Sequence, residues 1–237
     1  MEASPRTSKA ANAEKKTPYV ILSDFLRKYR LAVIGLFGAA VLAVIVVAVV
    51  TAISESQIAA SAAVSEKLDT DYATYEAESD QAKKADLEKS FIAEADSAIK
   101  AWPRRFASLR AYSYEAKIAA AKSDWATAEK DWLAIETSAP ASFLAPVALQ
   151  QAAVAAEEGG APDRALADYK RFVDKYAKTS IGLPHAYFAI GRLSEATKDY
   201  ASALAAYQKI DATWPDSDWT KLAMDRIIFL KSQGLQK

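Results

Sequence analysis

The sequence contains no cysteine and a single histidine, His185, among its 237 residues. Without thiols the chain forms no disulfide, no thiolate nucleophile and no cysteine zinc site, and it lacks the acylated cysteine of a bacterial lipoprotein. One histidine leaves too few nitrogen ligands for a zinc or haem site. We therefore expect no bound metal and no cofactor.

Motifs that bind phosphate or carry out catalysis are also missing. The chain has no P-loop, no GxGxxG fingerprint and no GxSxG nucleophile motif. Carboxylates are numerous, but they are scattered at positions that suit solvated helix faces rather than gathered in one motif. We expect a protein that is not an enzyme.

Glycine and proline are sparse, at 7 and 8 residues, whereas hydrophobic residues make up 51% of the chain. Alanine is abundant, and β-branched residues cluster mostly in residues 31–53. This balance favours helix over sheet, because alanine has the highest helix propensity and β-branched residues favour strands. The composition predicts an all-α protein.

The net charge is zero, but the charges are unevenly distributed. The first 30 residues hold seven basic and three acidic residues, which leaves 23 basic and 27 acidic residues for the rest of the chain. A basic tail therefore precedes a mildly acidic body. Nucleic-acid binding needs a basic face, so we expect no nucleic-acid partner.

The longest uncharged stretch runs from Leu31 to Ile53. As a helix it is roughly 34 Å long, enough for a hydrocarbon core of about 30 Å. The alternative is a cleaved signal peptide, since Val50-Thr51-Ala52 resembles a cleavage site. The run is longer than the usual apolar core of about 7–15 residues, and its leader is long. We predict a transmembrane helix at 31–53.

The flanking charges predict the orientation of this helix. Arg27, Lys28 and Arg30 directly precede it, whereas Glu55 and Glu66 follow it before any basic residue. Positive residues favour the cytoplasmic side. We predict a single-pass protein of the inner (cytoplasmic) membrane, with a cytoplasmic N-terminus and the remaining residues in the periplasm or another extracytoplasmic space.

The leader divides into two parts. Residues 1–18 are small and polar and are expected to form a disordered cytoplasmic tail. Residues 19–30 are amphipathic, because four apolar side chains share one helical face: Leu22, Phe25, Leu26 and Tyr29. This segment is either a short helix in the headgroup layer or an extension of the membrane helix.

The rest of the chain contains a repeat. Four stretches end alike, three of them in proline and three with Trp or Tyr just before the last position. They end at positions 103, 140, 177 and 215, so the interval between endings is nearly constant. Upstream of the last three endings, an alanine is followed four residues later by an aromatic residue: Ala128/Trp132, Ala165/Tyr169 and Ala203/Tyr207.

This pattern resembles the tetratricopeptide repeat, in which two antiparallel helices pack through small residues beside aromatic ones. The copy with Tyr187, Gly191, Ala203, Tyr207 and Pro215 matches best. The resemblance implies an α-solenoid of three to four helix pairs and a capping helix. Its domain bounds would be 54–103 for a stalk helix and degenerate first repeat, 104–216 for the repeats and 217–237 for the cap.

The expected helix pairs are 56–82/86–101, 104–122/124–138, 143–158/162–176 and 184–197/200–213, and the first helix is expected to continue from the membrane helix. The cap is expected at 217–233. Its apolar positions should cover the end of the stack: Leu222, Met224, Ile227, Ile228 and Leu230.

A solenoid of this kind exposes the first helix of each pair along its concave face. The candidate partner groove on that face consists of Lys117, Gln150, Val154, His185, Phe188, Arg192 and Glu195. Phe188 beside Arg192 is the best candidate contact, since it joins an apolar anchor and a charge. The alternative is that Phe188 packs against the next repeat.

The Phe-Leu-Arg-Lys-Tyr leader before one membrane helix and an alanine-rich repeat array resembles the YfgM family. That resemblance implies a scaffold associated with the Sec translocon and periplasmic chaperones. Two alternatives remain open. One is a structural component of another envelope machine, for secretion, motility, division or outer-membrane assembly. The other is a module that binds cell-wall glycan.

Overall fold

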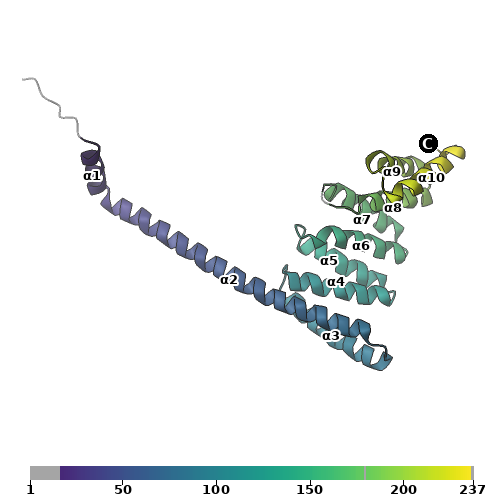
Figure 1. Cartoon of the computed structure of the whole chain (residues 1–237), viewed down its shortest axis with the longest axis horizontal. Coiled ribbons are helices and arrows are strands. Elements are labelled where there is room, and N and C mark those ends of the chain that lie inside the picture. Colours follow the sequence, from purple (N-terminus) through teal and green to yellow (C-terminus); the bar gives the residue numbers. More distant parts are fainter. Residues whose placement is uncertain (1–16, 179, 236–237) are drawn as a thin grey trace, which may run out of the picture. The chain divides into compact units, whose positions relative to one another are not determined.

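The computed structural model describes residues 17–178 and 180–235, the side chain of Asp24 excepted. Most of the tail expected at 1–18 lies outside these residues. The described residues form ten helices and no strand, which confirms the all-α prediction (Figure 1). The chain divides into two compact units, residues 1–57 and 58–237, which are taken in turn below.

The first unit contains α1 (Pro18–Lys28) and the beginning of α2 (Arg30–Ala77). The helix α1 ends at Lys28, because the next residue, Tyr29, has a φ of −109° and a ψ of 20° that depart from helical geometry. Phe25 and Tyr29 lie against each other, with ring centroids 4.9 Å apart. Residues 18–28 therefore form a helix of their own rather than a straight extension of α2.

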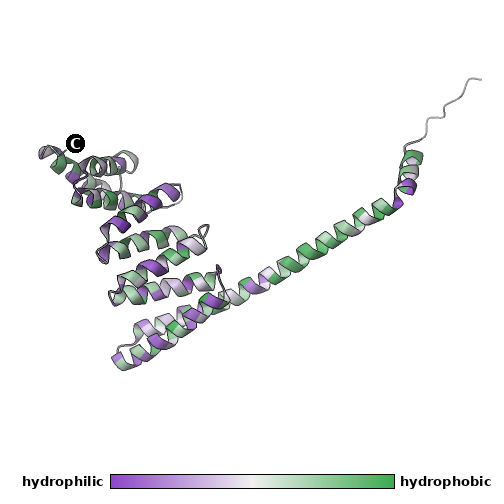
Figure 2. Cartoon of the chain, turned by 180° about the vertical axis from the view of Figure 1, so that it is seen from behind, coloured by the Kyte–Doolittle hydropathy of each residue, from purple (hydrophilic) through white to green (hydrophobic). Residues whose placement is uncertain are grey.

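The N-terminal half of α2 is long and apolar enough to cross a membrane, and its most apolar stretch is not buried at all. Figure 2 shows hydrophobic residues along this half of the helix. The core helix of a soluble protein has comparable composition but is largely covered by its neighbours. This half of α2 is therefore a candidate membrane span.

The second unit comprises residues 58–77 of α2 and eight further helices (Figure 1). From α3 onward each helix packs against the next in the chain. The helices are α3 (Gln81–Ala101), α4 (Phe106–Ala121), α5 (Trp125–Ser138), α6 (Leu144–Glu158), α7 (Pro162–Lys175), α8 (Leu183–Ala196), α9 (Tyr200–Thr213) and α10 (Asp218–Ser232).

Short polar residues begin several of these helices. The carboxylates of Asp80, Asp124 and Asp199 accept backbone N–H groups at the starts of α3, α5 and α9, and the Ser217 hydroxyl does so for α10. Such caps satisfy donors that have no partner within the helix. Because Asp80 caps α3, α2 ends at Ala77, five residues earlier than the 82 expected from the sequence.

Aromatic residues hold the N-terminal end of the second unit together. Tyr72 of α2 stacks on Tyr114 of α4, with ring centroids 4.1 Å apart and planes 17° apart. Phe91 of α3 meets both rings edge-on at 5.9 Å. These contacts join residues of α2 to the helix pair that follows.

The residues expected to pack the repeats lie in the core. Ala128, Ala165 and Ala203 are fully buried, as are Tyr169 and Tyr207, whereas Trp132 is partly buried. At Gly191 of α8, an added Cβ would lie 2.4 Å from Cε1 of Tyr207. That distance is too short for any real Cβ, so the close approach of α8 and α9 requires glycine.

The capping helix covers the stack with fewer residues than expected. Ile227 and Leu230 are buried together with Ala223. Leu222, Met224 and Ile228, which were expected to cover the end of the stack, are 47–63% exposed. Five apolar positions spread around α10 occupy more than one face of the helix, and only one face meets α8 and α9.

Candidate functional site

The candidate groove residues lie on α4, α6 and α8, the first helices of successive pairs. We call the surface that these helices share with α10 the A-helix face. It carries Lys117 on α4, Gln150 and Val154 on α6, and the remaining four candidates on α8. Contacts join α4 to α6 and α8 to α10, so this face is continuous between neighbouring repeats in both places.

The only histidine of the chain joins two repeats. Nε2 of Gln150 lies 2.7 Å from Nδ1 of His185. Because the amide NH₂ is a donor, Nδ1 accepts and the ring proton lies on Nε2. Burial and the nearby charge of Arg192 lower the pKa of His185, so the ring is neutral at pH 7. The edge of His185 meets Trp219 of α10 at 4.9 Å.

Two ion pairs on the A-helix face also join neighbouring repeats. Arg192 of α8 donates to Glu157 of α6 at 2.7 Å, and Arg226 of α10 donates to Glu195 of α8 at 3.0 Å. Burial disfavours the charge of Glu195, but hydrogen bonds from Arg226 and from the Tyr207 hydroxyl outweigh it and lower its pKa. The charges on α8 therefore link neighbouring repeats to each other.

A hollow of about 470 Å³ lies beside these pairs, lined by Phe188, Arg192, Glu195, Ala196, Tyr207 and Arg226. Phe188 is half-buried and lies 5.5 Å from the ring of Tyr207 and 5.3 Å from that of Trp219. It therefore packs against the next helices and also keeps part of its ring open to the hollow. The packing of Phe188 against the next helices is thus seen, and its role as a partner contact stays a prediction.

Lys117 and Val154 do not join this group. The ammonium of Lys117 lies over the rings of Tyr72 and Tyr114, at 5.5 and 5.1 Å from their centroids. Val154 packs against the core between α6 and α8. The structure thus gathers Gln150, His185, Phe188, Arg192 and Glu195 near the C-terminal end of the face.

Sequence reasoning missed two residues that complete this site. Trp219 and Arg226 of α10 lie at the hollow or beside it, yet α10 was expected only to cap the stack. Both follow His185 and Arg192 at the same interval, which is shorter than the repeat, so the period alone did not point to them. The capping helix therefore continues the A-helix face.

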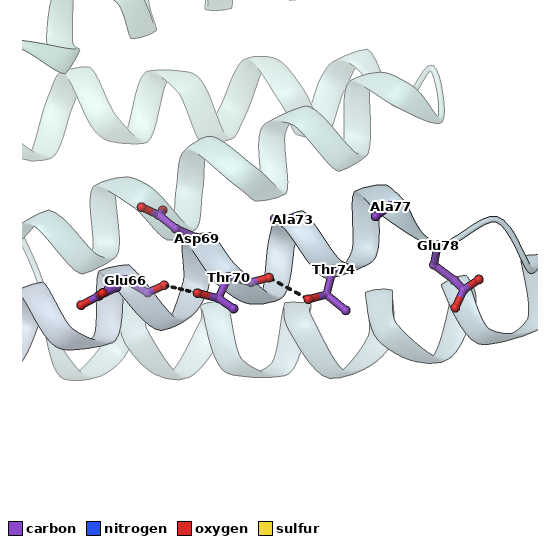
Figure 3. Close-up of a pocket in the computed structure, with 7 residues that line it drawn as sticks. All are labelled: Glu66, Asp69, Thr70, Ala73, Thr74, Ala77 and Glu78. Atoms are coloured by element: carbon purple, nitrogen blue, oxygen red, sulfur yellow. Dashed lines mark hydrogen bonds between the residues drawn. The ribbon is translucent and has the colours of Figure 1, made fainter.

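A larger hollow on α2 has a different character (Figure 3). It is lined by one face of α2 and the following turn: Glu66, Asp69, Thr70, Ala73, Thr74, Ala77 and Glu78. Thr70 and Thr74 donate to carbonyls one turn back in the same helix. A single helix face does not enclose a ligand. Within the described residues no group of three or more His, Asp or Glu is placed to hold a metal ion.

The comparisons with known proteins agree with the repeat. The chain is 29% identical over 133 residues to a TPR repeat-containing protein of Treponema pallidum (strain Nichols). The match covers 56% of this chain, and it spans only about half, 55%, of that relative. No family model and no solved structure matches the chain. The similarity and the helix pairs together support a tetratricopeptide-type repeat, a fold typical of non-enzymatic scaffolds.

Proposed function

We propose that this protein is a membrane-anchored scaffold that holds a protein partner at the C-terminal end of its A-helix face. The hollow beside Phe188 is the observation that carries the proposal. It is the place where an apolar ring, two arginines, the last helix pair (α8 and α9) and α10 meet on a face that solenoids use for binding.

The proposed setting is the extracytoplasmic side of an inner membrane. The exposed apolar half of α2 supports an anchor, and the basic residues before it support a cytoplasmic N-terminus. The YfgM-like plan of the chain makes the scaffold an adaptor that keeps chaperones or emerging clients near the Sec translocon. A component of another envelope machine is the alternative protein scaffold.

The chemistry of the hollow indicates what the partner offers. Arg192 and Arg226 already pair with Glu157 and Glu195, so they do not provide an open basic clamp for an acidic tail. The rings of Phe188 and Tyr207 instead offer apolar contact. A peptide segment with one large apolar side chain, whose backbone carbonyls meet the rim of arginines, fits this arrangement.

Site-specific photocrosslinking in native membranes tests the proposal. A benzophenone amino acid replaces Phe188 in the full chain, and trapped proteins are identified by mass spectrometry. We expect a specific crosslinked protein from this position. The matched control carries the same group at Ala205, which is exposed on α9 and lines no part of the hollow.

The identity of the trapped protein decides between the alternatives. Translocon subunits or periplasmic chaperones would support the adaptor. Flagellar or divisome proteins without translocon subunits would replace it with another envelope machine. Equal crosslinking from Phe188 and Ala205, or none from either, would contradict binding at the hollow. Circular dichroism of both variants checks that the repeat unit is folded.

A further inference from the structure

The helices of the second unit alternate in direction, so their connections fall at two opposite edges (Figure 1). We call the edge that leads into α4, α6 and α8 the A-edge. It consists of residues 102–106, 139–143 and 176–182, residue 179 excepted. The rings of Phe106 and Phe143 meet at 6.1 Å, and Gly182 adjoins the side chain of Gln150 on α6. These contacts place successive connections side by side.

Each of the three connections at the A-edge presents a large apolar side chain to solvent. Phe106 is 37% exposed, Phe143 is 73% exposed and Ile181 is fully exposed. Each of them follows the previous one at the interval of the repeat, so they occupy the same place in successive units. Isolated exposed apolar residues are ordinary on protein surfaces. A row repeated in three successive units indicates a surface that something covers.

Basic residues predominate at the A-edge. Its three connections contain Arg104, Arg105 and Lys178 and no acidic residue, and the following connection into α10, at 214–217, contains one acid, Asp216. The opposite edge, at 78–80, 122–124, 159–161 and 197–199, has no exposed large hydrophobic residue, and acidic residues outnumber basic ones there by four to two. An edge with exposed apolar residues and an excess of basic residues matches the boundary of an anionic lipid layer.

The path of the chain ties the first connection of the A-edge, at 102–106, to the residues that follow the apolar run of α2. The backbone N–H of Ala107 donates to the Ser61 hydroxyl at 3.2 Å, so α2 enters the second unit at this edge. Ser61 is eight positions after Ile53, the end of the uncharged run. Eight residues reach at most about 28 Å when extended and about 12 Å as a helix. If residues 31–53 span a bilayer, the first connection of the A-edge lies within this reach of its surface.

We propose that the A-edge lies on the membrane surface, with Phe106, Phe143 and Ile181 among the lipids and Arg104 and Lys178 near anionic headgroups. This inference rests on the membrane anchor of the proposed function. The tether keeps the edge at a high local concentration beside the lipid, so weak individual contacts are sufficient. The contact would hold the solenoid in one orientation above the bilayer.

Single-cysteine variants test this contact, because the natural chain has no cysteine. The full chain is reconstituted into vesicles of phosphatidylcholine and phosphatidylglycerol, and an environment-sensitive fluorophore is attached at Phe143→Cys. Doxyl-labelled lipids then report contact with the bilayer by quenching. Glu158→Cys, exposed at the opposite end of the same helix α6, is the matched control. Leu42→Cys, in the apolar run, reports the anchor itself.

We expect doxyl lipids to quench the labels at positions 42 and 143 and to leave the label at 158 bright. Adding Arg104→Gln and Lys178→Gln, or omitting phosphatidylglycerol, should reduce quenching at position 143 but not at 42. Quenching at 42 without quenching at 143 would overturn the surface contact and leave the anchor intact. A bright label at 42 would overturn the anchor and this inference together. A blue shift at 143 without lipid quenching would overturn the lipid contact and assign the edge to contact with a second copy of the chain.

Discussion

Three successive repeats carry different residues at one pair of equivalent positions, where the two helices of each repeat meet. Between α4 and α5 the pair is Glu115 and Asp131, between α6 and α7 it is Ala152 and Asp168, and between α8 and α9 it is Ile190 and Ala206. Each pair follows the previous one at the interval of the repeat, which makes these positions equivalent. The joint between the two helices thus changes from acidic to apolar along the chain.

The acidic joint places carboxyl groups where water is scarce. Burial, together with the charges of Asp131 and Asp96, raises the pKa of Glu115 to about 7. Burial likewise raises the pKa of Asp131 to about 6, despite the nearby Lys130. One oxygen of Glu115 is buried without a hydrogen-bond partner. These groups also line a shared hollow with Glu88, Lys122 and Asp124.

The apolar joint between α8 and α9 contains no carboxyl group at these two positions. Ile190 and Ala206 are each 6% exposed and belong to the core shared by α6 to α9. Glu195 of this repeat lies at another position of α8 and is paired with Arg226. Asp168 in the middle repeat is intermediate, since its pKa is raised by burial but Arg171 lies 3.4 Å away. The fold therefore does not require an acid at these positions.

The largest expected effect comes from moving the acidic pair into the apolar joint, which tests whether the difference between the two joints matters for stability. We expect Ile190→Glu with Ala206→Asp to lower the free energy of opening of α8 and α9 by about 3–5 kcal/mol at neutral pH, because two unpaired charges become buried. Hydrogen exchange of the full chain in detergent, resolved by mass spectrometry, measures this opening helix by helix.

The reverse exchange, Glu115→Ile with Asp131→Ala, is the control for the acidic joint. It should increase protection of α4 and α5, since well-packed apolar residues replace carboxyls whose charge is poorly solvated. Little change after the first exchange would mean that α8 and α9 tolerate buried acids, and the difference between the joints would then carry no energetic meaning.

The sequence was sufficient for the helices and their order because the regular period places alanine, aromatic and proline residues at fixed points. Most expected helices of the second unit agree with the structure to within a few residues. The start of α4 differs, at Phe106 rather than 104, because Arg104 adopts a positive φ of 63°. Single-residue backbone geometry of this kind has no clear signature in the sequence.

The site was less accessible to sequence reasoning. Equivalent positions in the repeat identified Phe188 and Arg192, but the period does not reveal that Arg192 is bound to Glu157 of the preceding repeat. Pairs between repeats depend on how far successive helices shift along one another, and that shift follows from side-chain packing. The buried environment of Glu115 was missed because a carboxylate on a helix is most often solvated.

The pH dependence of the acidic joint is the next largest effect. The pKa of Glu115 and of Asp131 is higher in the folded protein, so the folded state holds protons that the unfolded state releases. The stability that depends on these protons is fully present below the unfolded pKa values of about 4 and is lost as the pH rises through about 6 and about 7. We expect α4 and α5 to lose about 1–2 kcal/mol between about pH 5 and about pH 8, because partial solvation limits the cost.

Hydrogen exchange measures this pH profile when the labelling times are adjusted so that the intrinsic chemical exchange is the same at each pH. The variant Glu115→Gln tests whether Glu115 is the origin of the profile. The variant should flatten the dependence in α4 and α5 and leave that of α8 and α9 unchanged. An equally steep profile in Glu115→Gln would assign the effect to other groups.

The smallest effect concerns the paired acid of the apolar repeat. Hydrogen bonds lower the pKa of Glu195, so its contribution is present at neutral pH and is lost as the pH falls through the folded pKa, the opposite sign to Glu115. We expect Glu195→Gln to cost α9 and α10 about 0.5–1 kcal/mol at neutral pH, since the Arg226 side chain is 41% exposed and glutamine keeps one hydrogen bond. A double-mutant cycle with Arg226→Gln isolates the pair. Additive losses in that cycle would show that the ion pair contributes nothing, and the contrast would then lie only in the buried acids of the earlier repeat.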